Sequence, residues 1–214
     1  MVKIYSLIIN SLILIVPSLA LSHHPLNGGV MKNFNDGFLS GIGHPILGLD
    51  HLMFILGVGF ISYISKNFFN YSFTFITGTF LGMLSLIFGL YLPFYDIIIS
   101  VALICLGYLL LAKREYNYKG IIFSFFGIFH GWAYGSILLD SPSMNLQVLS
   151  GYSIGLLLTQ LLIIFSGYQF LKFLNNFKSF NTLFPQIFCG VLIGIASVNF
   201  FESFENYLLN FLNS

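Results

Sequence analysis

Charged side chains are scarce in this sequence of 214 residues, in which Asp, Glu, Lys and Arg together make up 7%. Soluble domains carry about 25% charged residues, so this chain lacks the polar surface that would keep it in water. Hydrophobic residues account for 57% instead. The composition predicts an integral membrane protein surrounded by the lipid bilayer. A net charge of +1 argues against a nucleic-acid partner.

Cysteine is also rare, and the two residues, Cys105 and Cys189, lie in separate apolar stretches. This spacing argues against a disulfide framework or a CxxC metal site, so we expect both thiols to be packing residues. The chain has no glycine-rich phosphate-binding loop either. The sequence therefore does not indicate nucleotide binding.

The first 22 residues have the pattern of a secretory signal peptide. Lys3 supplies a positive start, residues 4–16 are apolar, and Ala20 and Ser22 have the spacing of a small-x-small cleavage site. Cleavage after Ser22 would leave "HHPLNGG" as the mature start, outside the cytoplasmic membrane. The alternative is an uncleaved signal anchor.

Six further apolar stretches each approach the ~20 residues that a helix needs to cross hydrocarbon. They predict an all-α transmembrane domain over residues 38–201. A histidine-bearing segment, 23–37, precedes it, and a tail, 202–214, follows it, both on the periplasmic side. The predicted spans are 38–62, 71–93, 95–112, 120–139, 146–171 and 183–201.

The basic residues give the orientation of these spans. Cytoplasmic loops of membrane proteins carry an excess of Lys and Arg. With the mature N-terminus outside, only Lys32 of the mature basic residues lies on the outer side. The remainder fall inside: Lys66, Lys113, Arg114, Lys119, Lys172 and Lys178. Both termini are therefore predicted to be periplasmic.

Glycine recurs at every fourth position in several spans, which makes a flat helix face that allows close backbone contact. We expect these faces to hold a compact bundle together. The six spans divide into two triplets of opposite sense, which predicts a 3+3 inverted repeat with its site at the interface. The glycine sets are Gly78/Gly82, Gly127/Gly131/Gly135, Gly151/Gly155 and Gly190/Gly194.

Two histidines and an aspartate interrupt the first apolar stretch, in "GHPILGLDHLMFILGVGF". His44 and His51 share one helix face, with Asp50 beside His51. Counting ~1.5 Å per residue from Phe38 puts His51 ~20 Å into the membrane. A central aspartate costs about 2.5–3.5 kcal/mol on insertion, and such residues mark ion pathways. We interpret the three side chains as a site; the alternative is a carboxylate–histidine pair that satisfies itself in the core.

A third histidine, His130, lies in "FHGWAYG" at the middle of the fourth predicted span. Tyr134 is one turn away on the same face. The glycines of this motif allow a neighbouring helix to approach His130 closely. We therefore expect His44, His51 and His130 to converge at one depth.

Imidazole nitrogen with carboxylate oxygen suits Ni²⁺, Co²⁺ or Zn²⁺, and the lack of thiolate argues against Cu(I). Asp50 can ligate the ion directly. Alternatively, it can accept a hydrogen bond from His51 and so hold a ligating His51 in the correct tautomer. His23 and His24, with a freed α-amine, can capture metal outside the membrane. The alternative for these two residues is an ordinary flexible tail.

The two motifs resemble those of the HupE/UreJ family of hydrogenase and urease accessory membrane proteins. "HPILGLDH" matches that family's H-x5-DH, and "FHGWAYG" resembles its FHG-x-A-H-G-x-E. Tyr134 stands where the family has His, and Ile137 stands where it has Glu. Asp140, just beyond the helix, can replace the missing carboxylate. The "HHPLNGG" start and "AYG" resemble the family's cyanobacterial branch.

The resemblance implies a permease, and not an enzyme, in a bacterial cytoplasmic membrane. Its cargo would be a divalent transition-metal ion, Ni²⁺ foremost and Co²⁺ next, supplied to a metalloenzyme. The metal is then a transported substrate, with no cofactor bound permanently. The candidate metal residues are His44, Asp50, His51 and His130, with His23, His24, Tyr134 and Asp140 as further ones.

Two other classes fit part of the sequence. "GYSIG" at 151–155 matches G-x-S-x-G, so Ser153 with a membrane histidine would make an intramembrane serine protease of the rhomboid type. That motif belongs on a strand-to-helix turn in soluble hydrolases, however, and here it falls inside an apolar helix. A haem protein ligated by two membrane histidines is the second alternative.

Overall fold

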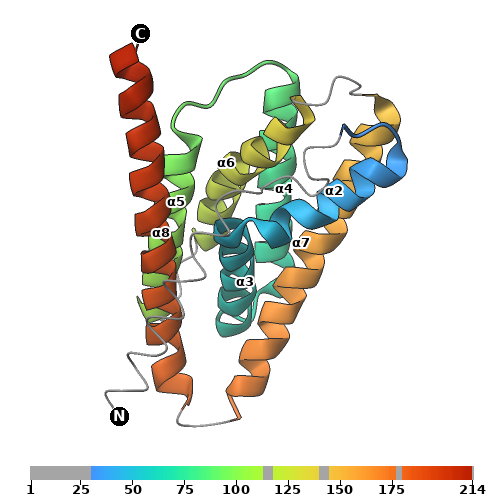
Figure 1. Ribbon diagram of the computed structural model, residues 1–214. Coiled ribbons are helices and arrows are strands. Elements are labelled where there is room, and N and C mark those ends of the chain that lie inside the picture. The colour runs from blue at the N-terminus through green and yellow to red at the C-terminus, as the bar shows by residue number, and fades with distance from the viewer. Residues whose placement is uncertain (1–29, 113–117, 140–144, 177–179, 214) are drawn as a thin grey trace, which may run out of the picture.

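The computed structural model describes residues 30–112, 118–139, 145–176 and 180–213, which leaves the predicted signal peptide outside the described residues. The described residues form α-helices and no β-strand, as the sequence predicts. Figure 1 shows these helices side by side in one bundle. They are α2 (Phe34–Leu47), α3 (Leu49–Ile64), α4 (Phe68–Ile87), α5 (Tyr95–Ala112), α6 (Lys119–Leu139), α7 (Leu146–Leu174) and α8 (Phe180–Asn213).

Fewer of these helices qualify as membrane spans than the six predicted. Among the described residues, four helices, α5 to α8, are long and apolar enough to cross a membrane, or five spans if α2 and α3 form one bent span. α4 has the length, but polar residues such as Asn70, Thr74 and Thr77 lower its hydropathy. The chain is therefore a multi-pass helical membrane protein.

The first predicted span, 38–62, is wrong as a single helix. α2 and α3 meet at an angle of 80°, because Gly48 between them has an extended backbone with φ −75° and ψ 102°. The Gly48 N–H still donates to the His44 carbonyl (3.1 Å), which ends α2. The bend places His44 at the end of one helix and Asp50 and His51 at the start of the next.

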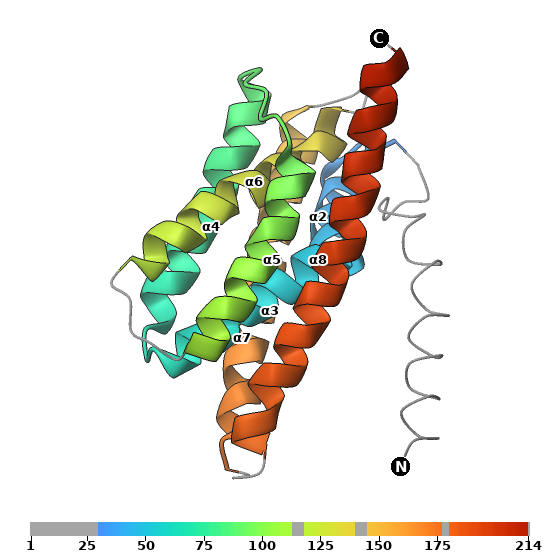
Figure 2. The same cartoon turned by 90° about the vertical axis from the view of Figure 1, so that its left-hand side faces the viewer.

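Glycines draw α4 against α6 (Figure 2). A Cβ atom added at Gly78 or Gly82 would overlap carbonyl oxygens of α6, so only glycine fits there. Gly127 and Gly131 of α6 meet the backbone of α4 in the same way. These contacts confirm the predicted role of the glycines in both helices.

α2 and α7 make a second contact of the same kind (Figure 1). Gly37 and Gly41 of α2 lie against carbonyl oxygens of α7, and Gly151 and Gly155 lie against carbonyl oxygens of α2. In both helix pairs the contacting residue numbers rise together, so the paired helices run in the same direction. One type of close parallel contact is thus used twice in the bundle.

The glycines of α8 behave differently from the prediction. A Cβ added at Gly190 or Gly194 would meet no atom within 4 Å, so this pair makes no close helix contact within the described chain. α8 packs on α5 through Cys189 instead, whose Sγ lies 2.9 Å from a Cβ placed at Gly107. Cys189 is buried and Cys105 partly buried, and both are free thiols, as their predicted packing role requires.

Two segments predicted as connections are helical or buried. α8 continues through the segment expected as a C-terminal tail and ends at Asn213. Lys119, expected in a loop, begins α6 and is buried, with 1% of its surface exposed. Its Nζ donates to Ser65 Oγ at the end of α3 (2.9 Å). This bond joins the ends of two helices that both carry predicted site residues.

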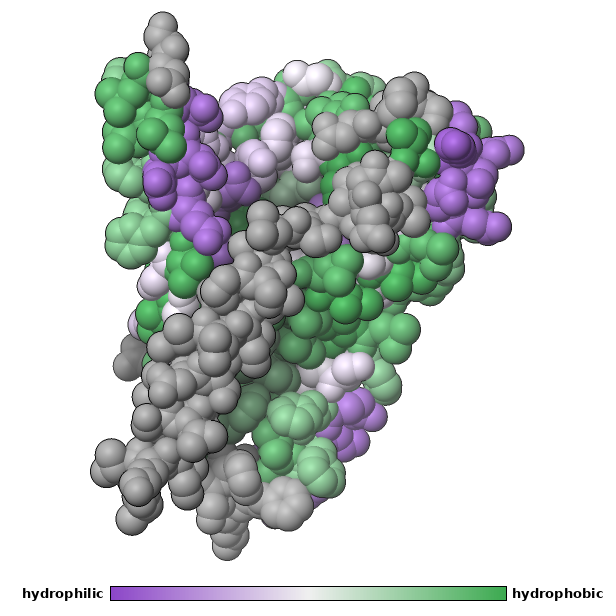
Figure 3. Space-filling model, viewed as in Figure 1, coloured by the Kyte–Doolittle hydropathy of each residue, from purple (hydrophilic) through white to green (hydrophobic). Residues whose placement is uncertain are grey.

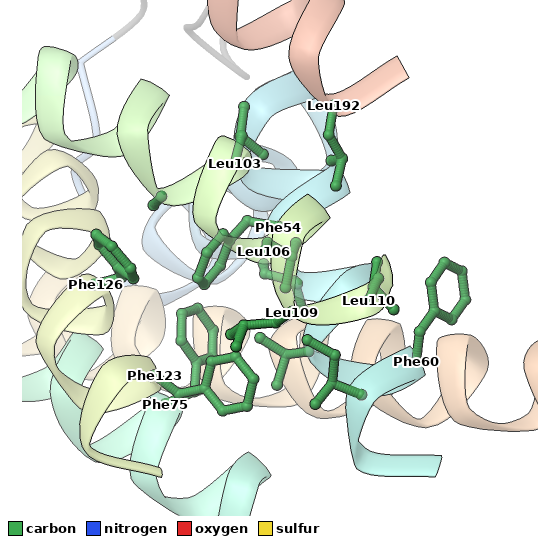
Figure 4. Close-up of a cluster of buried hydrophobic side chains, with 14 of the residues drawn as sticks. Phe54, Phe60, Phe75, Leu103, Leu106, Leu109, Leu110, Phe123, Phe126 and Leu192 are labelled. Atoms are coloured by element: carbon green, nitrogen blue, oxygen red, sulfur yellow. The ribbon is translucent and has the colours of Figure 1, made fainter. Parts of the chain in front are cut away.

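The outer surface and the core have the character of a membrane bundle. Figure 3 shows apolar side chains over the middle of one face, with polar ones gathered toward its ends. Inside, a layer of aromatic and leucine side chains fills the space between α3, α4, α5 and α6 (Figure 4). Phe54 and Phe75 of this layer lie against the ring of His130, one of the predicted site residues.

Candidate metal-ion site

Three helices bring the predicted histidines together in the protein interior. The ring of His51, in the first turn of α3, is 5.4 Å from the ring of His44 and 5.2 Å from that of His130, measured between centroids. The Tyr134 ring stands edge-on to His44 (5.1 Å) and His51 (4.8 Å). The predicted convergence of the two motifs is therefore present in the fold.

His44 is held by Tyr152, a residue of α7. Tyr152 donates its hydroxyl proton to the Tyr134 carbonyl oxygen (2.7 Å), and its oxygen lies 3.1 Å from His44 Nδ1. A tyrosine hydroxyl has one proton, so this oxygen can only accept from His44. Nδ1 therefore carries the proton of the neutral ring. The lone pair is then on Nε2, which is the state that ligates a metal.

His130 has the same tautomer for a different reason. Its Nδ1 lies 2.9 Å from the Phe126 carbonyl oxygen, which can only accept, so Nδ1 carries the proton. The Nε2 atom is buried and has no hydrogen-bond partner among the described residues. A buried nitrogen of this kind has lost its water and gained nothing in return. This nitrogen is therefore a ligand atom open to a further partner.

Asp50 and His51 form the charged end of the cluster. The Asp50 carboxylate accepts a hydrogen bond from the His51 backbone N–H (2.8 Å), and the same oxygen lies 3.6 Å from His51 Nδ1. At 3.6 Å the carboxylate is too far from Nδ1 for a hydrogen bond, so Asp50 acts on the His51 ring through its charge. Asp50 lies in the first turn of α3, where the helix dipole also favours a negative charge.

The three imidazoles lie in a row and do not form a closed shell. Within the described residues, no three His, Cys, Asp or Glu side chains lie close enough together to hold a metal ion in this conformation. Phe54 covers one side of His130, with 4.5 Å between ring centroids. The arrangement is an enclosed chain of donor atoms, and a bound ion would need the rings to turn toward one another.

The remaining predicted residues are only partly placed. Tyr134 lies within the cluster and is fully buried. His23, His24 and Asp140 lie outside the described residues. Ser153 is partly exposed between Gly151 and Gly155, and no hydrogen bond of the described residues joins it to a histidine. The glycines of "GYSIG" therefore have the packing role expected for them.

The sequence did not reveal four buried polar residues beside the histidines, which are Ser40, Thr79, Tyr152 and Gln160. Each lies in an apolar helix outside the two histidine motifs. Ser40 is one turn before His44, so the helix period could have identified it. Tyr152, Thr79 and Gln160 come from other helices, and only the three-dimensional packing brings them to the site.

The fold and the cluster define a multi-pass helical membrane protein with histidines gathered in its interior. The family described as HupE / UreJ protein matches residues 11–200, and the chain belongs to this family. No curated protein and no solved structure matches the sequence.

Proposed function

We propose that the protein is a permease for a divalent transition-metal ion, with Ni²⁺ as the foremost cargo and Co²⁺ as the next. The observation that carries the proposal is the convergence of three imidazoles in the interior, with the ring centroid of His51 5.4 Å from that of His44 and 5.2 Å from that of His130. Hydrogen bonds at Nδ1 leave the Nε2 lone pairs of His44 and His130 as ligand atoms, and the Asp50 carboxylate lies beside His51. Imidazole nitrogens on adjacent rings are a donor set for Ni²⁺ and Co²⁺.

The charge of the cluster suits an ion that binds and then leaves. The candidate residues His44, Asp50, His51 and His130 include one carboxylate, that of Asp50. Its single negative charge offsets only half of the charge of a divalent cation. Transport requires binding that is weak enough to allow release. A row of neutral rings beside one carboxylate meets that requirement better than a closed shell of charged ligands would.

The repeated glycine contact supports an inverted repeat. One constant shift along the chain relates Gly37 and Gly41 of α2 to Gly127 and Gly131 of α6. A second constant shift relates Gly78 and Gly82 of α4 to Gly151 and Gly155 of α7. Each contact therefore joins one helix of the first half to one helix of the second half, and the repeat interchanges the two contacts. We infer that the α2–α7 pair and the α4–α6 pair rock against each other around the histidines and expose them to each side alternately.

The first of these shifts also bears on the residue predicted as a substitute carboxylate. When the same shift is applied to residues 49–50, which read "LD", it gives residues 139–140, which also read "LD". Asp140 would thus be the counterpart of Asp50 in the second half. We propose that Asp140 attracts the cation at the outer side, together with His23 and His24 of the mature N-terminus.

The proposed setting is a bacterial cytoplasmic membrane, with the N-terminus periplasmic after signal cleavage. In this orientation the aromatic layer around Phe54 and Phe75 lies between the histidines and the cytoplasm. The metal delivered inside would supply a metalloenzyme such as a hydrogenase or urease, in keeping with the accessory role that the family resemblance implies. No resident cofactor is needed for this activity.

Uptake of radiolabelled Ni²⁺ and Co²⁺ into cells with and without the protein tests the proposal. We expect uptake at limiting metal only in cells that make the protein, with competition between the two ions. A matched control is the His51→Ala variant at equal membrane abundance. Equal uptake in cells that lack the protein, cells that contain it and cells that contain the variant would disprove the permease.

A further inference from the structure

Several buried polar atoms beside the histidines lack a hydrogen-bond partner among the described residues. They are Ser40 Oγ, His130 Nε2, Tyr134 Oη and the Nε2 position of the Gln160 amide. Folded proteins pair nearly all buried polar groups, so each exception needs a physical reason. Gln160 is the most informative of them, because it is fully buried in α7 and belongs to neither histidine motif.

Thr79 fixes the direction in which the Gln160 amide points. Thr79 Oγ1 lies 2.8 Å from the Ile76 carbonyl oxygen and 3.2 Å from the Gln160 amide. A hydroxyl has one proton, and a carbonyl can only accept, so the proton of Thr79 goes to Ile76. Thr79 can then only accept from Gln160. The amide NH2 group must therefore face Thr79.

This assignment makes the atom on the other side of the amide an oxygen. The oxygen and nitrogen of a glutamine amide have nearly the same shape, and the surrounding hydrogen bonds decide which is which. The unpartnered position of Gln160 is thus a carbonyl oxygen that has lost its water. An unpaired carbonyl oxygen in a membrane protein interior is a ligand group for cations.

The Gln160 oxygen lies at the edge of the histidine cluster. The Gln160 amide interacts with the Tyr134 phenol, although no hydrogen bond of normal geometry joins them. The Tyr134 ring in turn contacts both His44 and His51. The Tyr134 hydroxyl can donate its proton to the Gln160 oxygen, whose second lone pair then stays open to a further ligand on the side of the cluster that faces α7.

We propose that Gln160 supplies a carbonyl-oxygen ligand to the transported cation, and that Thr79 is the positioning residue that turns the amide toward it. The inference rests on the proposed function and adds an oxygen side to a site of imidazole nitrogens. A neutral oxygen ligand completes the coordination of Ni²⁺ or Co²⁺ without adding charge. The additional ligand strengthens binding of the ion, and the absence of further negative charge still allows its release.

Titration of the purified protein with Co²⁺, followed by its visible ligand-field absorption, tests this assignment. We expect Gln160→Leu to weaken Co²⁺ binding about tenfold and to shift the absorption bands, because one ligand is lost. Gln160→Glu keeps an oxygen at the same place, so it should bind Co²⁺ at least as tightly as the wild type. Thr79→Val should weaken binding less than Gln160→Leu, and Thr79→Ser should restore it.

The matched control is Gln147→Leu, which makes the same change at an exposed position of the same helix. It should leave the Co²⁺ spectrum unchanged. A Gln160→Leu protein with the wild-type spectrum and affinity would overturn the inference while the permease stands. If Gln160→Leu does not fold, the inference is overturned when Gln160→Glu shows the wild-type spectrum. Absence of Co²⁺ binding by the wild type, together with absence of uptake, would overturn the proposed function itself.

Discussion

The two glycine-packed helix pairs, α2 with α7 and α4 with α6, share a backbone arrangement but differ in chemistry. The shift that matches the glycines of α2 with those of α6 also matches Ser40 with His130 and His44 with Tyr134. His44 and Tyr134 meet edge-on at 5.1 Å between ring centroids. Close packing is thus common to both halves, whereas the donor atoms differ at each matched position.

The pairs also differ in the backbone beyond their glycines. α2 breaks at Gly48 and turns by 80° into α3, whereas α6 continues unbroken through the matching position, Leu138. Only the first half of the chain, in which α2 breaks from α3, therefore presents the start of a helix to the cluster. Asp50 lies in the first turn of that helix. The first half supplies a carboxylate and the N-terminal end of a helix dipole to the cluster. The second half supplies His130 from the continuous helix α6.

The largest effect is expected where the shared packing itself is broken. Gly82→Leu in α4 and Gly41→Leu in α2 both push a side chain into a neighbouring backbone that has no room to move. Overpacking usually costs about 1–3 kcal/mol, and here the backbone itself is in the way. We expect little folded protein in the membrane, measured by yield and by the monodisperse fraction in detergent.

Gly194→Leu in α8 is the matched control for these variants, because a Cβ there meets no atom within 4 Å. It should express and purify like the wild type. Normal folding of Gly82→Leu would show that the close contact between α4 and α6 is not required.

The next effect concerns the charged half. His51→Ala and Asp50→Asn should each lower uptake at limiting Ni²⁺ by about 10–100-fold, because each removes a ligand or its orienting partner. Uptake of radiolabelled Ni²⁺ at equal membrane abundance measures this loss. Excess metal should partly rescue His24→Ala, which affects only capture, but not His51→Ala. Ser153→Ala is the control and should transport normally; a well-expressed but inactive Ser153→Ala protein would point to the protease.

A third change would make the two halves more alike. Tyr134→His places an imidazole opposite His44, where the second half of the chain now has a phenol. A nitrogen ligand suits Ni²⁺ and Co²⁺ better than a neutral phenol does, so we expect about tenfold tighter binding of both. Isothermal titration of the purified variant measures it, with Tyr134→Phe as the comparison. Equal affinities of the two variants would remove Tyr134 from the site.

The smallest effect is expected from the bond that joins the halves. Tyr152→Phe removes the hydroxyl that binds both His44 Nδ1 and the Tyr134 carbonyl. A hydrogen bond of this kind contributes about 0.5–1.5 kcal/mol. We expect a few-fold weaker Ni²⁺ binding and a small drop in thermal stability, both measured on purified protein. Tyr63→Phe, at the other end of the bundle, should change neither.

The features that could be predicted from the sequence are those that depend on the helix period alone. Composition and the i, i+4 glycines predicted the all-helical bundle and three of its four glycine contacts. The break at Gly48 was missed, since a count of apolar residues does not report a single extended backbone. Tyr152 and Gln160 were missed because α7 lies far along the chain, and only the α2–α7 contact brings its polar side chains to His44.

The late position of α7 has a consequence for the order in which the protein is assembled. The glycine face of α2 finds its partner only when Gly155 has been made, about 110 residues after Gly41. At ~5–20 residues per second, this delay is on the order of ten seconds. During it, α2 has 14 residues, too few to cross the bilayer alone. Its His44 and Ser40 must then be shielded by the insertion machinery or by the nascent chain itself until α7 arrives.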